Sequence, residues 1–347
     1  MNRRSVLFII VVMVTMLFTS CNEWFEEDEL NYRCVKTFTI TPNKLIKEFE
    51  ISPNGNRFFA VVNNVVYICD FNTGNIIDSF PNEWVSSCCW SPDGNRIVVG
   101  DRWLELWDAN SCRRLEEYIT RDSFDYINRT ETYYSLNFNR NGTRIAGGAI
   151  EQYWTAPEGS TEIIAGPGQG FINIWDVNGD NYTYIKTIEE HTQTINDLIW
   201  SPDGNRIVTA SGDSTLRILD VNEGRCLKVL KHKDEIWTVA ANADFSRIAS
   251  GSCDGKIKIW NPNTGECVKT INGHNDYIQS LVFSPDGKYL VSGSTDKTMK
   301  IWDVNTGDRL QKCIGFDGDV RRVRFTPDGK YIVTASYDGT VKVWSQE

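Results

Sequence analysis

The sequence has few basic residues relative to acidic ones, with 36 Lys and Arg against 46 Asp and Glu and a net charge of −10. Sequence-independent nucleic-acid binding needs clustered Lys and Arg that displace counterions from phosphates. The deficit therefore argues against a nucleic-acid partner. The acidic balance favours solubility without indicating which other partner the protein binds.

Signals of cofactor chemistry are also missing. The chain has no Cys-x-x-Cys pair, and no group of His, Cys and carboxylate residues has the spacing of metal ligands. One Gly-rich stretch at 166–170 is followed by no Walker lysine and by no expected helix, which excludes a phosphate-cradling loop of that type. We therefore expect neither a metal nor a cofactor.

What the chain does have is an internal repeat. A Ser-Pro-Asp-Gly turn begins at Ser91, Ser201 and Ser284, and related turns begin at Ser52 and Thr326. With two weaker relatives, seven units start near positions 52, 91, 139, 201, 243, 284 and 326. The last four units begin 41 or 42 residues apart, which is the length of a four-stranded propeller blade.

The sixth unit shows the strands most clearly. Its residues alternate with the period of two that strands require, and Pro and Gly mark the turns between them. The expected strands are Ile278–Phe283, Tyr289–Ser294, Met299–Trp302 and a fourth near Arg309–Cys313. Four short strands cannot bury both faces alone, so the units must stack around an axis. This predicts an all-β, seven-bladed β-propeller with four-stranded antiparallel blades.

The third strand ends with Trp-Asp in three units, and here the chain resembles the WD-repeat family. These dipeptides are Trp107-Asp108, Trp175-Asp176 and Trp302-Asp303. In that family a His, a Ser or Thr, an Asp and a Trp form a buried hydrogen-bonded network that locks a blade. The matching sets are His232, Ser250, Asp254 and Trp260 in one unit and His274, Ser292, Asp296 and Trp302 in the next.

All three histidines of the chain occupy this one repeat position, because His191 precedes Thr209 and Asp213 at the same spacing. A His, a hydroxyl and an Asp could also be read as a catalytic triad. Three copies in three units favour architecture, since an enzyme needs one constellation. The resemblance therefore implies structural tetrads, and we expect no catalytic residue among them.

The two ends of the chain predict how the ring closes. Arg33–Thr37 nearly repeats residues 266–270, which form an outer, fourth strand, and the chain ends just after the third strand of the seventh unit. We therefore predict that Arg33–Thr39 pairs with Val341–Trp344 as the missing outermost strand. This pairing leaves no long open edge.

Ten cysteines raise the question of disulfides. Cys34, Cys226 and Cys267 occupy the same place in three units and should lie far apart. Cys88 and Cys89 are adjacent in a strand and point to opposite faces. Because a disulfide needs Cα atoms within about 7 Å, we expect mostly unpaired thiols.

The first twenty residues follow different rules. Arg3 and Arg4 precede an apolar run at 6–18 that is too short to span a bilayer and is typical of a secretory signal. The run leads into Leu-Phe-Thr-Ser-Cys, which resembles the lipobox of bacterial lipoproteins and implies a lipid on Cys21. An uncleaved signal-anchor helix is the alternative. Residues 1–20 are thus the expected signal peptide, 21–32 an acidic tether, and 33–347 the propeller.

The third unit carries two insertions, near 119–131 and 150–170. As loops they would emerge on one face of the ring, the top face, and such insertions often mark the binding face of a repeat array. The alternative is that these insertions have no function and are tolerated because surface loops can lengthen at little cost in stability. Exposed aromatic and Arg side chains are the usual anchors of interfaces. The candidates for partner binding are Trp84, Phe124, Tyr126, Tyr153, Trp154, Tyr277, Arg321 and Tyr337.

These features favour a non-catalytic, protein-binding scaffold propeller, held by its N-terminal lipid at the outer membrane or on the periplasmic side of a bacterial membrane. A propeller hydrolase or lyase with a central-channel site is one alternative. It would need carboxylates near the axis, and the top-face register offers Glu235, Asp276 and Asp319 but no spare His. A purely structural envelope protein is the other alternative.

Overall fold

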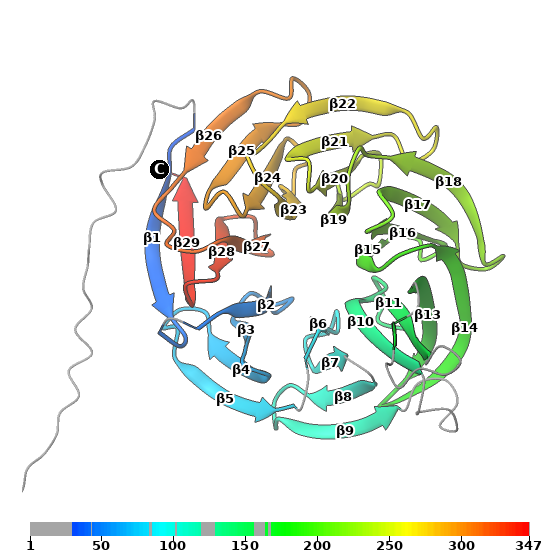
Figure 1. The fold of residues 1–347 in the computed structure, drawn as a ribbon. Helices are drawn as coiled ribbons and strands as arrows, with labels where there is room; N and C mark the ends of the chain where they lie inside the picture. Colours follow the sequence, from blue (N-terminus) through cyan, green and yellow to red (C-terminus); the bar gives the residue numbers. More distant parts are fainter. Residues whose placement is uncertain are drawn as a thin grey trace, which may run out of the picture.

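The protein is described by a computed structural model that covers residues 30–42, 44–82, 85–100, 103–118, 129–155, 164–165 and 168–346. Seven antiparallel sheets stand as blades around a central channel (Figure 1). The prediction of an all-β, seven-bladed propeller is confirmed. The expected signal peptide and Cys21 lie outside the described residues. Within the described ranges, no helix is long and apolar enough to cross a membrane.

In the first three blades the strands run outward from the channel in chain order. Blade one contains β2 (Ile46–Ile51), β3 (Arg57–Val62), β4 (Val65–Asp70) and β5 (Ile76–Pro81). Blade two contains β6 (Ser87–Trp90), β7 (Arg96–Gly100), β8 (Leu104–Asp108) and β9 (Arg113–Tyr118). Blade three contains β10 (Arg129–Phe138), β11 (Arg144–Thr155), β13 (Gln169–Asn178) and β14 (Asn181–His191), with the short β12 (Ile164–Ala165) paired to β11.

The next three blades repeat this order, and the seventh borrows its outer strand. Blade four contains β15 (Ile195–Trp200), β16 (Arg206–Ser211), β17 (Thr215–Asp220) and β18 (Arg225–Lys231). Blade five contains β19 (Ile236–Ala241), β20 (Ile248–Ser252), β21 (Lys256–Trp260) and β22 (Cys267–Asn272). Blade six contains β23 (Ile278–Phe283), β24 (Tyr289–Ser294), β25 (Met299–Asp303) and β26 (Arg309–Cys313). Blade seven contains β27 (Val320–Phe325), β28 (Tyr331–Ser336), β29 (Thr340–Gln346) and β1 (Tyr32–Thr39).

The repeated Ser-Pro-Asp-Gly turn joins the two innermost strands of a blade. In blade six, the Ser284 hydroxyl donates to the Asp286 carboxylate at 2.6 Å and accepts the Tyr289 N–H at 2.9 Å. Gly287 has a φ of 71°, a conformation that costs other residues free energy. Side-chain hydrogen bonds and a left-handed Gly together make this four-residue sequence a strong turn signal.

The N-terminal strand β1 closes the ring. It pairs antiparallel with β29, with Arg33 opposite Ser345 and Thr39 opposite Thr340 (Figure 1). Its first residue is also held by blade six, because the Gln311 side-chain amide exchanges two hydrogen bonds of 2.9 and 2.8 Å with the backbone of Tyr32. The predicted ring closure is confirmed.

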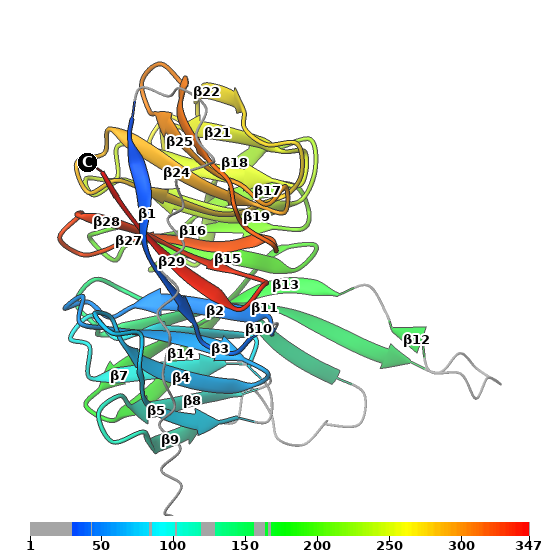
Figure 2. The same cartoon turned by 90° about the vertical axis from the view of Figure 1, so that its left-hand side faces the viewer.

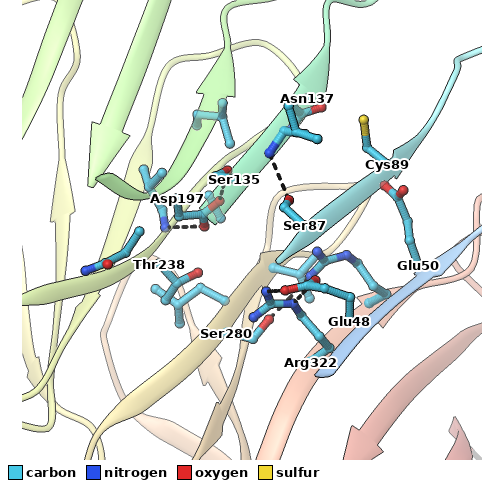
Figure 3. Close-up of a pocket in the computed structure, with 18 of the residues that line it drawn as sticks. Glu48, Glu50, Ser87, Cys89, Ser135, Asn137, Asp197, Thr238, Ser280 and Arg322 are labelled. Carbon is cyan, nitrogen blue, oxygen red and sulfur yellow. Dashed lines mark hydrogen bonds and ion pairs between the residues drawn. The ribbon is translucent and has the colours of Figure 1, made fainter. Parts of the chain in front are cut away.

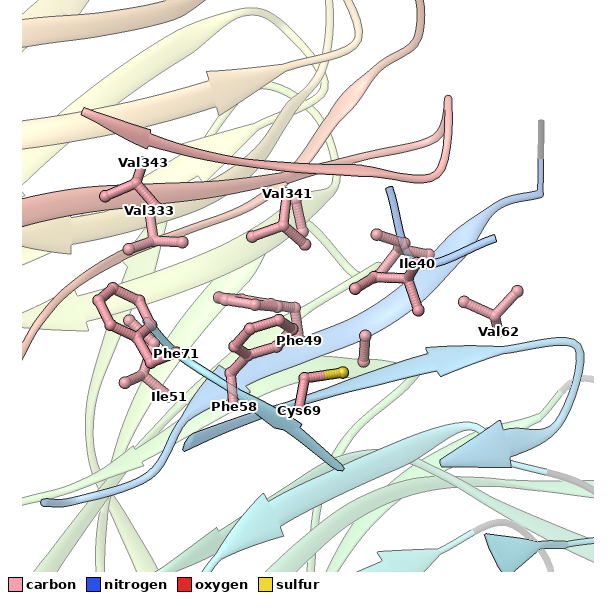
Figure 4. Packing of buried hydrophobic residues seen from close by; sticks show 13 residues of the cluster. Ile40, Phe49, Ile51, Phe58, Val62, Cys69, Phe71, Val333, Val341 and Val343 are labelled. Atoms are coloured by element: carbon pink, nitrogen blue, oxygen red, sulfur yellow. The ribbon is translucent and has the colours of Figure 1, made fainter. Parts of the chain in front are cut away.

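Aromatic packing fills the junction between blade seven and blade one. The Phe58 ring lies 5.4 Å from that of Phe49 and 6.5 Å from that of Phe71, centroid to centroid. Val341 and Val343 of β29 face these rings (Figure 4). Each buried side chain of this size stabilises the fold by about 1.5–3 kcal/mol. The junction where the ring closes therefore has a hydrophobic core of its own.

The insertions of blade three differ from the loops expected at 119–131 and 150–170. The inner strands continue past the other blades, and Arg129 of β10 pairs with Tyr153 of β11, while Trp154 pairs with Ala165 of β12. The extended strands form an arm that projects from one face of the ring (Figure 2). Backbone pairing explains the difference, because a ladder provides partners for N–H and C=O groups that a loop leaves to water.

All nine cysteines within the described residues are thiols. Cys226 and Cys267 lie at the same irregularity of their outer strands, β18 and β22, in neighbouring blades. Cys88 packs into the core between blades one and two, and Cys89 into the core between blades two and three. Adjacent strand residues thus face opposite cores, as the sequence indicated.

Candidate functional site

One end of the channel opens on the face that carries the arm, and we call this the top face. The residue before each inner strand lies there, and its carbonyl accepts a hydrogen bond from the residue just after the second strand. These pairs are Thr194 with Gly212, Glu235 with Cys253, Tyr277 with Thr295, and Asp319 with Tyr337, at 2.9–3.0 Å. The repeated bond fixes equivalent positions in four adjacent blades. The structure therefore places the predicted residues Tyr277 and Tyr337 on the top face.

An arginine stacked between two aromatic rings occupies the channel mouth at blades five to seven. The Arg321 guanidinium carbon lies 5.7 Å from the centroid of the Trp237 ring and 5.8 Å from that of the Tyr337 ring. Its Nη1 donates to the Gln279 side-chain oxygen. Burial and the neighbouring Arg322 lower the pKa of Arg321. Sequence reasoning selected Arg321 and Tyr337 as anchors but gave no sign of their contact or of Trp237.

The rim of this mouth is aromatic and acidic. Tyr277 and Tyr337 are 46% and 37% exposed, and Tyr134 on the inner strand of blade three is 43% exposed. Glu235 and Asp319 lie at positions equivalent to Tyr277 on the same face, and Asp276 directly precedes Tyr277. Burial raises the pKa of Asp319, with a further increase from Asp276 that Lys297 and Arg321 oppose. The mouth therefore combines aromatic surface with negative charge.

Below the mouth, the inner strands line a cavity of about 260 Å³ (Figure 3). Six inner strands contribute the residue that follows a register shift in the ladder. Strand β6 contributes its first residue, and the seven residues form a ring. The ring consists of Glu48, Ser87, Ser135, Asp197, Thr238, Ser280 and Arg322. Two residues further along lies a second ring of Glu50, Cys89, Asn137, Ile199, Ala240, Val282 and Arg324.

The first ring joins neighbouring blades. The Ser87 hydroxyl accepts the Leu136 N–H at 3.0 Å, and Ser135 accepts the Leu198 N–H at 3.1 Å. Asp197 and Ser280 accept the equivalent N–H groups of the following blades at 2.9 and 3.2 Å. Each bond ties a side chain of one blade to the inner strand of the next. The polar residues of the channel are therefore structural ties between blades.

Blade seven meets blade one through an ion pair instead. Arginine cannot accept a hydrogen bond, and Arg322 donates from its Nε to the Glu48 carboxylate at 3.0 Å and again from Nη2. Nearby, burial raises the pKa of Glu50 to about 7, although Arg324 and the Trp90 N–H oppose the shift. Glu50 accepts that N–H at 2.8 Å.

The carboxylates that line the channel are poorly placed for general acid–base catalysis. Its three carboxylates are Glu48, Glu50 and Asp197, which the sequence did not single out, and all three accept hydrogen bonds from other residues. All three histidines of the chain lie in blade networks away from the channel. No channel carboxylate therefore has an imidazole partner for general acid–base chemistry.

Blade six contains the full predicted tetrad. His274 contacts the Asp296 carboxylate through Nδ1 at 2.8 Å and the Ser292 hydroxyl through Nε2 at 2.7 Å. The Trp302 indole donates to the same hydroxyl at 2.8 Å. Blade four has the same His191–Asp213 and His191–Thr209 contacts, at 2.8 and 2.7 Å. The repetition of one geometry in separate blades supports a structural role for the network.

Blade five departs from this geometry at one contact. His232 contacts Ser250 at 2.6 Å, and Trp260 donates to Ser250 at 2.9 Å. The Asp254 carboxylate lies 3.9 Å from His232 Nδ1, too far for a hydrogen bond, and this buried nitrogen has no hydrogen-bond partner. The sequence predicted a complete tetrad here, so the fourth contact is a correction. Burial lowers the pKa of His232 to about 4, helped by Lys258 and Lys256.

A threonine explains the difference between the blades. In blades four and six, Thr215 and Thr298 follow the Asp by two residues, and each hydroxyl donates to the carboxylate at 2.6 Å. That bond leaves the other carboxylate oxygen facing the histidine. Blade five has Lys256 at this position, and only its backbone N–H reaches Asp254, at 3.0 Å. The missing hydroxyl therefore accounts for the displaced carboxylate.

Blades two, three and seven replace part of this network with other groups. In blade two the buried Glu105 accepts the Trp107 indole N–H at 2.9 Å. In blade three the Tyr133 hydroxyl accepts from the Asn173 amide at 2.6 Å. In blade seven Phe316 takes the place of the histidine and packs on Trp344, with centroids 5.6 Å apart.

The other predicted binding residues are only partly placed by the structure. Trp84, Phe124 and Tyr126 lie outside the described residues. Tyr153 and Trp154 belong to β11 in the arm, where Tyr153 pairs with Arg129 and Trp154 with Ala165. The arm and the channel mouth share the top face, so the structure brings together the two regions from which the candidates came (Figure 2).

Seven four-stranded blades, Trp-Asp strand ends and buried His-hydroxyl networks make this chain similar to the WD-repeat β-propellers. Comparison with known families supports this class. Residues 194–347 match the family model described as IFT122 first beta-propeller. Residues 74–108 match the one described as WD domain, G-beta repeat.

Individual relatives are similar over part of the chain. The anaphase-promoting complex subunit cdc20 of Dictyostelium discoideum is 24% identical over 205 residues, 50% of this chain and 40% of that protein. Nuclear distribution protein PAC1 of Ajellomyces capsulatus (strain H143) is 28% identical over 152 residues, 43% and 32% of the two chains. The mRNA export factor of Xenopus tropicalis is 32% identical over 77 residues, 22% and 21% of the two chains. The matched region thus spans less than half of each of these relatives.

Proposed function

We propose that this chain is a non-catalytic scaffold that binds a protein partner through its top face. The observation that carries the proposal is the channel mouth, where Tyr277 and Tyr337 stay exposed around a stacked Arg321. Aromatic and Arg side chains supply most of the binding energy in protein interfaces. The relatives named above are a complex subunit, a distribution protein and an export factor, which supports a role in binding.

The two alternative functions, an enzyme and a structural envelope protein, would each require different features of the molecule. A hydrolase or lyase needs a reactive group with a base in reach, and the channel carboxylates are held by Arg322 and by backbone N–H groups. A purely structural envelope protein needs no exposed aromatic mouth. The binding function accounts for both the occupied channel groups and the exposed rings.

We further propose that residues 21–32 tether the propeller to the outside of a bacterial membrane through a lipid on Cys21. The sequence at 17–21 supports this attachment. The tether would end at Tyr32, where the Gln311 hydrogen bonds fix the start of β1 to blade six. Force on the lipid would then reach the ring through a strand that two blades hold.

The binding face is tested by a photo-crosslinking side chain placed at Tyr277 or Tyr337 and, as a control, at Glu266 or Asp308. The control residues precede the outer strands β22 and β26, at the end of the blades away from the mouth. We expect a crosslinked partner from the top-face positions and none from the controls. Equal crosslinking from both ends, or from the controls alone, would contradict the proposal.

A second pair of variants tests the arm. Replacing Tyr153 and Trp154 with Ala should weaken crosslinking at Tyr277 and leave the melting temperature nearly unchanged, if these rings contact the partner. A loss of several degrees with undiminished crosslinking would mean that they cover the core of blade three instead. Truncating an aromatic anchor at an interface typically costs about 2 kcal/mol or more.

A further inference from the structure

The Arg321 guanidinium at the channel mouth has unused donors. Among the described residues, Nη1 donates to Gln279 and Nη2 has no acceptor within hydrogen-bond distance, while the Nε is buried beyond the reach of a binding partner. A guanidinium carries five N–H donors, so the two N–H groups of Nη2 remain available to a binding partner. At the floor of the mouth, the Arg321 guanidinium can therefore donate to an acceptor oxygen of a bound molecule.

The rim of the mouth carries carboxylates, in contrast to the cationic Arg321 at its floor. Glu235 and Asp319 occupy equivalent positions in blades five and seven, and neither carboxylate makes an ion pair or a side-chain hydrogen bond with a described residue. Asp276 lies close enough to Asp319 to raise its pKa. The one nearby amine, that of Lys297, donates to the Asp317 carbonyl at 3.0 Å. Lys297 and Arg321 act on Asp319 as nearby cations, so the three carboxylates of the rim exceed the positive charges described beside them.

These two features exclude simple occupants. A small anion would meet Arg321 but also three carboxylates, and a small cation would meet the rim but leave the guanidinium without an acceptor. Nucleic acid and anionic lipid would both be repelled by the rim. A polypeptide carries both complementary groups, because its backbone supplies carbonyl oxygens at every residue and its side chains supply cations.

We infer that the top-face mouth binds an extended segment of a partner protein that is rich in Lys and Arg. A backbone carbonyl of the segment accepts from Arg321, and its cationic side chains pair with Glu235, Asp276 and Asp319. The aliphatic stems of these side chains pack on Tyr277 and Tyr337. This inference rests on the proposed function and specifies the chemistry of the partner.

The test uses the full chain and two fluorescent nine-residue peptides that differ only at alternate positions, which hold Lys and Arg in one and Glu and Asp in the other. We expect the basic peptide to bind at least about tenfold more tightly, by fluorescence anisotropy, and more weakly as salt screens the rim charges. Equal binding of the acidic peptide would overturn the inference.

Matched variants locate the site. The double variant Glu235→Gln and Asp319→Asn should weaken the basic peptide about three- to tenfold, as expected for two exposed charge pairs. The control, Glu266→Gln and Asp308→Asn, removes the same charge at the other end of the blades and should change affinity less than twofold. Arg321→Lys keeps the charge but removes the planar fork of donors, and it should weaken both the basic peptide and an uncharged peptide of the same length.

The outcomes separate this inference from the function on which it depends. If the control variant loses as much affinity as the rim variant, the attraction is general and the inference fails. If the peptide does not bind but a partner still crosslinks at Tyr277, the binding face stands and the basic segment is wrong. Self-association that the rim variant abolishes, measured by sedimentation, would identify a second copy of the chain as the occupant and would also overturn the inference.

Discussion

Replacing Lys256 with Thr should stabilise the propeller by completing the blade-five network. The hydroxyl would donate to one oxygen of Asp254, as Thr215 and Thr298 do at 2.6 Å in blades four and six. The other oxygen would then face His232 Nδ1, which is 3.9 Å away in the present chain. The change therefore removes a buried donor that lacks an acceptor and adds one side-chain hydrogen bond.

The magnitude follows from these two bonds. A buried, unsatisfied donor costs about 1–3 kcal/mol, and a typical intramolecular hydrogen bond contributes about 0.5–1.5 kcal/mol net. Loss of side-chain entropy on fixing the carboxylate offsets part of this gain. We expect a stabilisation of about 1–2 kcal/mol, which in a chain of this size raises the melting temperature by about 1.5–3 °C.

Thermal unfolding by circular dichroism measures the shift, and the imidazole NMR signals report its cause. With only three histidines in the chain, the titration of His232 can be followed by itself. Its pKa of about 4 should rise in Lys256→Thr, because a cation leaves and a carboxylate arrives. Lys256→Ala removes the cation without adding a hydroxyl and should give little stabilisation.

Blade six provides the reverse experiment. Thr298→Lys should release Asp296 from His274 and lower the melting temperature by a similar amount. The explanation is refuted if Lys256→Thr melts at or below the parent temperature while its His232 titration stays the same. It is equally refuted if Thr298→Lys is neutral.

Four further outcomes are expected. Because burial holds the pKa of His232 near 4 against an ordinary 6.5, the free energy of unfolding should fall by up to about 3 kcal/mol as pH drops from about 6.5 to 4. His232→Phe, which imitates Phe316 of blade seven, should flatten that part of a profile of unfolding free energy against pH. An unchanged slope would contradict the assignment. The raised pKa of Glu50, about 7 against 4.5, works in the opposite direction, so stability should fall as pH rises from about 4.5 to 7; Glu50→Gln should gain stability over the parent at pH 8 but not at pH 4, as urea unfolding would show. Deleting residues 21–40 should sharply lower the melting temperature because β29 loses its partner β1, and a deletion that melts like the parent would disprove the role of β1 in closure. Cys21→Ser should abolish both incorporation of labelled fatty acid and partition into detergent while the propeller stays folded; equal labelling of both proteins would place no lipid at Cys21.

The repeat made most of the fold predictable. Each Ser-Pro-Asp-Gly turn encodes its own hydrogen bonds and left-handed Gly, so the strand boundaries near Ser284 could be read locally. The similarity of Arg33–Thr37 to an outer strand predicted closure for the same reason. The arm escaped prediction because its sequence has no counterpart in the other units, and its strands depend on pairing between distant segments.

The ion pair in the channel could not be predicted from the sequence. Glu48 and Arg322 are far apart in sequence, and each has an ordinary small polar residue at the equivalent position of most other blades. Nothing local marks either residue, and their ion pair exists only because blade seven meets blade one. The missing contact between His232 and Asp254 in blade five, in contrast, could have been predicted from the sequence. Lys256 stands there at the position that Thr215, Thr298 and Thr340 occupy in blades four, six and seven.

The pairing of β1 with β29 also determines when the molecule can finish folding. Tyr32 is opposite Gln346, so β1 must wait until β29 has been synthesised. At a synthesis rate of about 5–20 residues per second, that wait is on the order of 15–60 s. The entropy of closing so long a loop makes the pairing a late and slow event. A chain truncated before β29 therefore keeps β1 without its partner, so ring closure reports that synthesis has passed this strand.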